Sequence, residues 1–563
     1  MKRLSFIMFG AVLMSLTASA VPVKPGRWTT LTLADGTTVR AEARGSEFGN
    51  WWQDGNGQCY VLQDGKFVKI DRQTLSEDIK KRSLARRSQT RATAASTLNG
   101  LGYKDWNSYG SLPSLGEWDI PVLMVEFTDA TFKPQHDQSL IQDYMAKEGF
   151  KYEYNSNSCG SIRDYFVAQS QGKFKPNFKL LGKVKVNKSY TYYGKNGKDK
   201  DEKCDELPGD AMRAAKEQLQ VDFTQFSKPA PDKWHNAGIP LICLLYAGEA
   251  ESAVTEKPDL LWPHQKDFDD KNRDIAGVGV QLNSYLVSNE LEMVKQEGSP
   301  AVERLAGIGV FCHELGHALG LPDWYCTDAE VEKKYPHDDA FGNWSIMDSG
   351  AYEGEGWVPV GYTAYERSFM GWMDLGTYNE KDHYTLSAPN GKLPAFVIFK
   401  DSNEESKEYF VVETRYPSTW NPAEHGTGLM ITRYAYDEND WLYDRPNNDK
   451  ANKRGMVITA DQQKIDDNAK PSNLFGNGVN AISGLKFYSG AVSTFSFSNI
   501  TKNEDGSVSF DFDPGTGTAI EAIHADGQSQ DQWYDLQGRK LSDGQLKKGI
   551  YIHNGKKVIF PSR

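Results

Sequence analysis

The stretch HELGHALGLPD, residues 313–323, narrows the fold and the chemistry of this chain more than any other part of the sequence. On a helix, His313 and His317 are four residues apart and lie on one face, so both imidazoles can bind the same metal ion. Glu314 directly follows His313 in the sequence, which places it near such a metal but not necessarily bound to it. A carboxylate placed there suits a general base that acts on a water molecule.

Gly320 and Asp323 extend this motif. Gly320 ends the helix, and because glycine adopts backbone conformations that other residues avoid, the chain can turn back there. Asp323 can then reach the same metal as a third ligand. Two histidines and one carboxylate leave the fourth position of zinc open, as in catalytic rather than structural sites. We therefore expect His313, His317 and Asp323 to bind Zn²⁺.

A second arrangement of the metal ligands would recruit a distant glutamate. Glu353 or Glu366 would then take the place of Asp323 as the third ligand. The spacing of Gly320 and Asp323 favours the first arrangement.

Length and charge restrict the class of protein. The 563 residues exceed one compact domain, and the net charge of −12 argues against a nucleic-acid binder. Lys2 and Arg3, an apolar run over 4–16 and the small residues 18–20 predict a secretory signal peptide over residues 1–20. Because no later run of about 20 apolar residues follows, we expect no transmembrane anchor.

Several segments resemble the immune-inhibitor-A family of metzincin-type metallopeptidases. HELGHALGLPDWY (residues 313–325) matches the zinc signature of that family, with aspartate in place of the more usual third histidine, and SIM (345–347) matches its methionine turn. Further similarity lies in residues 120–129, 161–174, 247–264, 408–415 and 425–434. The resemblance covers about residues 118–513.

The resemblance implies a secreted zinc endopeptidase that is made as a zymogen and hydrolyses peptide bonds in proteins. Zinc would lower the pKa of a water molecule and polarise the scissile carbonyl, and Glu314 would take the water's proton and later deliver it to the leaving amine. Some metzincins have a tyrosine two residues after the methionine. Here that position is Ser349, which leaves Tyr352 as a substitute candidate.

Changes in composition, together with what the resemblance implies, divide the chain into five predicted segments. They are a signal peptide (1–20), a β-rich pro-segment with a cleavable linker (21–105), an α/β (α+β), metzincin-like peptidase domain (106–385), a β-sandwich domain (386–515) and a small C-terminal β unit (516–563). In the linker, basic residues are followed by small and polar ones. This segment could equally be a plain inter-domain connection.

Individual elements can also be predicted. We expect buried strands over 120–127 and 239–246 and helices over 139–147 and 161–169. Ser299-Pro300 has the pattern of a helix start, so the metal-site helix is expected to run over 299–319. The sandwich strands should include 395–399, 409–414, 429–434 and 508–512.

The tail resembles C-terminal sorting domains of type IX secretion. The similar stretches are WYDLQGRKL (533–541) and KKGIYIHNGKKVIF (547–560). The resemblance implies contact with secretion machinery and a secreted or cell-surface location. A small β module without any targeting role is the alternative.

Cysteine and acidic residues add secondary hypotheses. The Cys59 thiolate could cap the zinc of a zymogen, because Zn²⁺ binds sulfur well, or Cys59 could be a buried or bridged cysteine. Disulfides pairing Cys312 with Cys326 and Cys159 with Cys204 are conceivable among many connectivities. A cluster of aspartates could bind Ca²⁺ or form a solvated acidic loop. Its members are Asp267, Asp269, Asp270 and Asp274.

Two lone histidines, His264 and His425, are expected to be structural hydrogen-bonding groups rather than metal ligands.

Two other functions compete with a zinc endopeptidase. One is a non-catalytic, adhesin-like surface binding protein whose zinc site is structural. The other is a hydrolase of non-peptide bonds, since HExxH does not specify the bond attacked. As partners we expect protein or peptide substrates and no nucleic acid, and we expect the chain to be a monomer.

Overall fold

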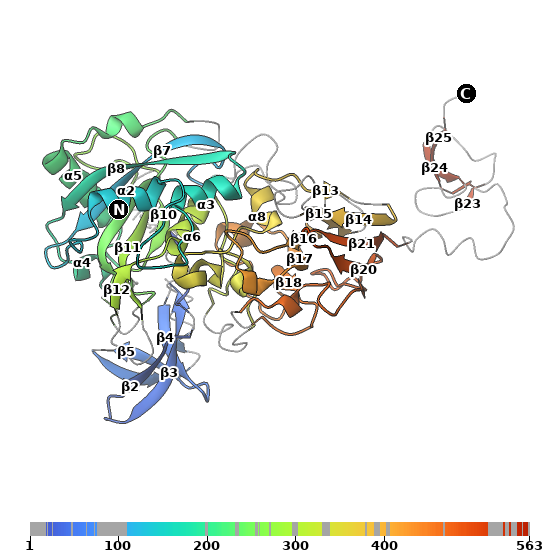
Figure 1. The fold of residues 1–563 in the computed structure, drawn as a ribbon, viewed down its shortest axis with the longest axis horizontal. Helices are drawn as coiled ribbons and strands as arrows, with labels where there is room; N and C mark the ends of the chain where they lie inside the picture. The colour runs from blue at the N-terminus through green and yellow to red at the C-terminus, as the bar shows by residue number, and fades with distance from the viewer. Residues whose placement is uncertain are drawn as a thin grey trace, which may run out of the picture.

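In the computed structural model the strands of the described residues form five β-sheets (Figure 1). The structure describes residues 18–19, 21–24, 26–46, 49–63, 65–71, 74–75, 110–196, 201–230, 236–253, 257, 259–268, 272–294, 302–328, 338–377, 380–387, 395–400, 406–465, 468–515, 533–534, 540–541, 549–553 and 556–560. The predicted signal peptide, apart from Ala18–Ser19, and the predicted linker over 77–105 lie outside these residues.

The central sheet has the strand order β1-β10-β11-β9-β7-β8, with β12 paired to β11. Strands β8, β7, β9 and β11 run parallel to one another, whereas β10 and β12 pair antiparallel with β11, and β1 pairs antiparallel with β10. The strands are β1 (Ala18–Ser19), β7 (Gly116–Glu126), β8 (Phe174–Lys185), β9 (Ile242–Glu249), β10 (His264–Asp267), β11 (Ser284–Val294) and β12 (Val302–Leu305).

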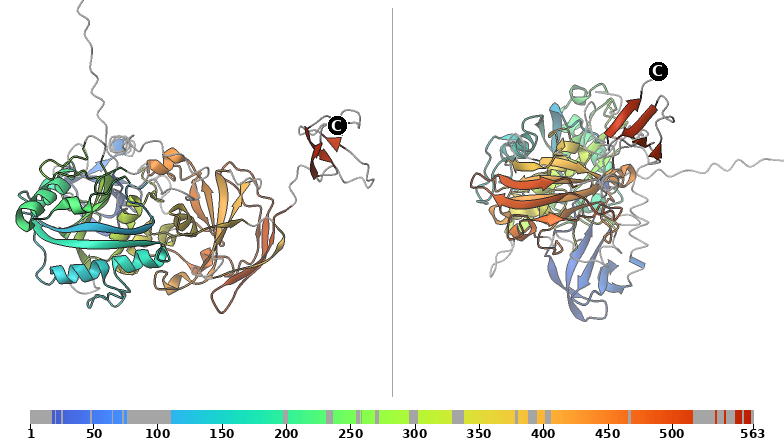
Figure 2. Two further views of the ribbon diagram at one scale, coloured as in Figure 1. Left: turned by 90° about the horizontal axis from the view of Figure 1, so that it is seen from above. Right: turned by 90° about the vertical axis from the view of Figure 1, so that its right-hand side faces the viewer.

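Helices cover both faces of the central sheet (Figure 2, left). On β7, Val122 and Met124 enter one apolar core and Leu123 and Val125 enter the other, which confirms the strand predicted to be buried on both faces. The first core contains α2 (Gln138–Ala146), α3 (Ile162–Gln169) and α6 (Gly309–Ala318), and the second contains α4 (Tyr190–Gly194), α5 (Glu206–Leu219) and the 3-10 helix η1 (Phe223–Phe226).

The metal-site helix begins later than predicted. Residues 302–305 form β12 on the edge of β11, and α6 starts only at Gly309; the predicted start at Ser299 lies outside the described residues. Strand pairing explains the late start, because residues 302–305 pair with β11; where the helix does begin, a Cβ atom at Gly309 would lie 1.8 Å from the Ala351 carbonyl oxygen. The backbone of the first turn therefore rests directly on η3 (Ser349–Gly356).

The N-terminal sheet is an antiparallel meander in the order β2-β3-β4-β5-β6. Its strands are β2 (Trp28–Thr32), β3 (Thr38–Ser46), β4 (Gly49–Asp54), β5 (Cys59–Gln63) and β6 (Lys66–Ile70). Trp52 and Tyr60 lie in its core, and so does Trp262, which precedes β10. Trp262 thus ties this sheet (blue in Figure 1) to the central sheet.

Two further sheets pack face to face across one apolar core (Figure 2, left). Phe396 and Phe410 face this core from the sheet β13-β15-β16-β17-β18, and Phe497 and Phe510 face it from the sheet β14-β21-β20-β19. The strands are β13 (Gly376–Thr377), β14 (Asp382–Leu386), β15 (Ala395–Phe399), β16 (Glu408–Arg415), β17 (Gly428–Ala435), β18 (Gly455–Ile458), β19 (Ile482–Ser483), β20 (Ser496–Lys502) and β21 (Val508–Asp513). All four strands predicted for this region are present.

The remaining short elements connect these parts or stand at the C-terminal end. They are η2 (Gly342–Trp344), α8 (Ala364–Phe369), η5 (Ala423–His425), α9 (Glu438–Leu442), η6 (Pro471–Asn473) and the sheet formed by β22 (Trp533–Tyr534), β23 (Lys540–Leu541), β24 (Gly549–His553) and β25 (Lys556–Phe560). That last sheet stands apart from the other four in Figure 1. Of the helices that the structure describes, none is both long and apolar enough to cross a membrane.

Candidate metal centre

Helix α6 and the turn that follows it carry the three predicted metal ligands. Gly320 has a φ of 101°, a conformation that favours glycine, and the Leu321 amide donates to the Gly316 carbonyl. The chain therefore folds back along the last turn of the helix. This brings Asp323 to the face that carries His313 and His317.

The three ligand side chains meet in the protein interior. The Nε2 atoms of His313 and His317 are 3.0 Å apart, and each lies 3.2 Å from Oδ1 of Asp323. All three side chains are buried. Among the described residues this is the one group of three or more histidine, cysteine or carboxylate side chains whose ligand atoms come this close together.

The hydrogen bonds of the histidines show that the group suits a cation. His313 Nδ1 lies 2.7 Å from the Ile346 carbonyl oxygen, and His317 Nδ1 lies 2.8 Å from that of Leu321. A carbonyl oxygen only accepts, so each Nδ1 carries a proton, and in the neutral form of each ring, the form that binds a metal, Nε2 presents a lone pair. Two lone pairs and a carboxylate oxygen at 3.0–3.2 Å repel one another unless a shared cation lies among them. These donors fit zinc.

Electrostatics within the group favour an ionised Asp323. Burial lowers the pKa of His313. Burial also lowers the pKa of His317, but the attraction of Asp323 outweighs it and raises the pKa overall. Burial would raise the pKa of Asp323, yet the two histidines hold it below its ordinary value. An ionised carboxylate is the form that binds a metal.

The predicted methionine turn packs against α6. The Ile346 carbonyl orients His313, and the Trp324 amide donates to the Met347 carbonyl over 2.9 Å. Gly316 makes the approach of Met347 possible, since a Cβ atom there would lie 2.6 Å from the Met347 sulfur. The sequence interpretation missed this role of Gly316, although a glycine within the helical motif was the available signal.

The alternative third ligands lie elsewhere. Glu366 accepts hydrogen bonds from Trp324 Nε1 (2.7 Å) and Ser345 Oγ (2.5 Å), and burial raises its pKa. It therefore holds the methionine turn in place. Glu353 accepts from the side-chain amide Nδ2 of Asn343 and lies 3.4 Å from His425 Nε2. Neither glutamate belongs to the group that Asp323 completes.

Glu314 is buried beside the metal ligands and contacts a distant segment of the chain. Its Oε1 accepts a hydrogen bond from the Val21 amide over 2.9 Å, and both residues are fully buried. Nothing in the sequence pointed to this contact. Cys59, the predicted zinc cap, lies instead in a small core with Trp51 and Leu75. The structure thus places Val21, and not Cys59, at the site.

Neither of the two conceivable disulfides is present. Each of the six cysteines is described, and none of them forms a disulfide. Cys312, for example, lies in the apolar core on the inner face of α6, where burial raises the pKa of its thiol well above the ordinary value.

The acidic cluster gives no support for calcium. Asp269 and Asp270 lie outside the described residues, and Asp267 accepts from the side-chain amide Nε2 of Gln265 over 2.7 Å. Among the described residues, Asp267 and Asp274 belong to no metal-binding group.

The lone histidines are hydrogen-bonded as predicted. His264 Nδ1 lies 2.8 Å from the Trp262 carbonyl oxygen and its Nε2 lies 3.0 Å from the Tyr285 hydroxyl. His425 packs against Trp344 and pairs with Glu353.

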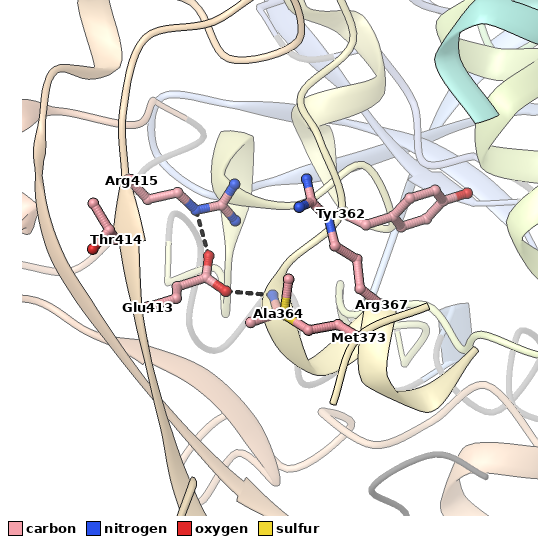
Figure 3. A pocket seen from close by; sticks show the side chains of 7 residues that line it. All are labelled: Tyr362, Ala364, Arg367, Met373, Glu413, Thr414 and Arg415. Carbon is pink, nitrogen blue, oxygen red and sulfur yellow. Dashed lines mark hydrogen bonds and ion pairs between the residues drawn. The ribbon is translucent and has the colours of Figure 1, made fainter. Parts of the chain in front are cut away.

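A small polar pocket separates α8 from β16 (Figure 3). Glu413 accepts from the Ala364 amide at the start of α8, and its other oxygen lies 2.6 Å from Arg415 Nε. The volume of about 20 Å³ accommodates roughly one water molecule. The hydrogen bonds of Glu413 therefore link the helix to the sheet, and the pocket has no room for a substrate.

Comparison with known proteins agrees with this geometry. Residues 120–377 match the family model described as immune inhibitor A peptidase M6, catalytic domain. The chain is 22% identical over 309 residues to the pre-pro-metalloprotease PrtV of Vibrio cholerae serotype O1, a match that covers 51% of this chain and 32% of the relative. It is 23% identical over 285 residues to immune inhibitor A of Bacillus thuringiensis subsp. alesti, covering 45% and 39%.

The chain thus spans between about a third and two fifths of the length of these curated relatives. The matched segment contains α6, the methionine turn and all three ligand side chains of the metal centre. Residues 120–377 are thus similar to the catalytic domain of the immune inhibitor A family of M6 peptidases.

Proposed function

We propose that this chain is a zinc-dependent endopeptidase that hydrolyses peptide bonds in proteins. The observation that carries the proposal is the buried convergence of His313, His317 and Asp323, with the two Nε2 atoms 3.0 Å apart and each Nδ1 held by a backbone carbonyl oxygen. Glu314 lies on the same helix beside them. Similarity to a peptidase family selects peptides over other bonds as the substrate.

Each side chain has a separate role in the proposed reaction. His313, His317 and Asp323 hold the zinc, which when bound lowers the pKa of a water molecule and polarises a carbonyl. Glu314 takes a proton from the water and returns it to the leaving amine. Met347 and Gly316 support the ligand helix through their close contact. A purely structural zinc site, as in the adhesin-like alternative, has no use for a buried carboxylate at position 314.

The remaining sequence-based predictions complete this proposal. A signal peptide over residues 1–20 exports the chain, and residues 21–105 form a pro-segment that keeps the enzyme latent until the linker is cut. The peptidase domain (106–385) and the sandwich domain (386–515) follow, and the unit over 516–563 directs secretion or surface attachment. The enzyme acts outside the cell.

A chelation and substitution experiment tests the proposed function. The purified full chain, after cleavage of the linker, should hydrolyse casein, lose the activity with a zinc chelator and regain it with added Zn²⁺. Glu314→Ala should abolish hydrolysis and leave about one zinc per chain, whereas Glu117→Ala, at an exposed salt bridge, should change neither. Hydrolysis that persists in the chelator, or loss of zinc from the Glu314 variant, would contradict the assigned roles.

A further inference from the structure

Residues Val21–Lys24, the cover segment, reach the candidate metal centre at Glu314, the neighbour of His313 on α6, and make this contact through their backbone. The Val21 amide donates to Glu314 Oε1 over 2.9 Å. The Val21 carbonyl accepts from Trp262 Nε1 over 3.0 Å, and the Pro22 carbonyl accepts from the Tyr352 hydroxyl over 2.7 Å. Three side chains from different elements therefore bind consecutive peptide groups.

The other end of the cover segment is anchored on both sides. The Lys24 side chain forms an ion pair with Glu292 on β11, and its amide donates to the Ser252 carbonyl over 3.3 Å. The Val23 amide donates to the Gly45 carbonyl on β3 over 3.0 Å. The cover segment is thus attached to the N-terminal sheet and also bound to the peptidase domain.

These contacts are of the kind that a peptidase makes with a peptide. They involve amide and carbonyl groups, which every polypeptide offers, and they place one amide on the carboxylate proposed as the general base. With Val21 and Glu314 both at 0% exposure, that oxygen of Glu314 faces a peptide group instead of water.

We propose that the cover segment is the chain's own inhibitor of the metal centre, and that Trp262 and Tyr352 are the side chains that hold its backbone there. This inference rests on the proposed peptidase function and specifies how latency is maintained. The same two side chains are then available to bind the backbone of a substrate once the cover segment has left.

The predicted signal cleavage fits this arrangement. Cleavage after Ala20 makes Val21 the first residue, and its amino group then lies against the Glu314 carboxylate. A charged donor makes a stronger hydrogen bond to a carboxylate than an amide does. Cutting of the linker frees the N-terminal sheet, and the cover segment leaves with the sheet because Val23 is bonded to β3.

Deletion of the cover segment from the exported full chain tests the inference. Two quantities are measured before any linker cleavage, as verified on gels: the initial rate of hydrolysis of a fluorogenic peptide, and the rate at which bound Zn²⁺ passes to a chromogenic chelator. Deletion of residues 21–24 should raise both about tenfold or more, because three backbone hydrogen bonds are lost. Asp35→Ala, in the exposed turn between β2 and β3, should raise neither.

A charge exchange provides a milder variant that preserves the chain length. Lys24→Glu places two carboxylates together and should raise both rates about threefold, and Lys24→Glu with Glu292→Lys should restore the original values. Unchanged rates in both the deletion and the Lys24 variant, with melting temperatures that show folded protein, would overturn the inference.

The two measurements separate failure of the inference from failure of the proposed function. If the chain is not a peptidase, no variant hydrolyses the peptide, yet the deletion still speeds the transfer of zinc to the chelator. If only the inference is wrong, the linker-cleaved chain hydrolyses the peptide, while the intact chain and the deletion variant behave alike in both assays.

Discussion

The two sides of the metal centre are held in place by different kinds of contact. On one side, Gly316 and Met347 pack so closely that a single additional carbon atom would overlap the methionine sulfur. On the other side, the cover segment is held by backbone hydrogen bonds and the ion pair of Lys24 with Glu292. Close side-chain packing resists any displacement, whereas a few separate polar contacts can be broken and formed again. The difference indicates that the contact of Gly316 with Met347 is a permanent support of the site, whereas the cover segment can be removed.

The largest effect is expected from the ligands that both sides surround. Asp323→Ala leaves two histidines without their carboxylate partner, so zinc per chain, measured by atomic emission on the linker-cleaved protein, should fall well below one, and hydrolysis should stop. Glu353→Ala removes a carboxylate outside the group and is the matched control. Full zinc content in the Asp323 variant would remove Asp323 from the ligand set.

Replacement of Glu314 separates chemistry from metal binding. In Glu314→Gln the rate of peptide hydrolysis should fall by about 10²-fold or more, because the amide cannot take up the proton. Zinc content should remain at one per chain. A rate within about tenfold of the original enzyme would show that another group is the base.

Adding one methyl group at Gly316, where α6 contacts Met347, should lower the stability of the protein. Gly316→Ala forces Met347 or α6 to move and should lower the free energy of unfolding by about 1–3 kcal/mol, measured by denaturant titration. Gly55→Ala, where a Cβ atom meets nothing within 4 Å, serves as the control and should change it by less than about 0.5 kcal/mol. Equal effects of the two variants would contradict the close packing.

Loss of one hydrogen bond to the cover segment should have the smallest of these effects. Tyr352→Phe removes the donor to the Pro22 carbonyl, worth about 1 kcal/mol, so zinc should pass from the intact full chain to a chelator about fivefold faster. Tyr154→Phe, at an exposed tyrosine, is the matched control. If both substitutions leave the rate unchanged, the Tyr352 hydroxyl has no part in holding the cover.

Spacing along the sequence was sufficient to predict those parts of the site and the fold whose residues are close together in the chain. Four residues on a helix place His313 and His317 together, and a glycine three residues later returns the chain so that Asp323 reaches them. Alternating or continuous apolar residues likewise predicted β7 and the strands of the two packed sheets. The start of α6 was mispredicted because residues 302–305 found a partner in β11, and pairing between strands outweighs a local capping pattern.

By itself the sequence determined which residues are the candidate metal ligands and general base, since these residues are close together along the chain. The family resemblance drew in addition on segments spread over residues 118–513. Only the tertiary structure decided what lies over the site. The Val21 amide and Glu314 are 293 residues apart, and Trp262 and Tyr352 reach the same segment from two further elements. A backbone amide carries no sequence signal of its partner, because every residue other than proline has one. The position of the cover segment therefore depends on how the N-terminal sheet packs beside the peptidase domain, which is a property of the tertiary structure.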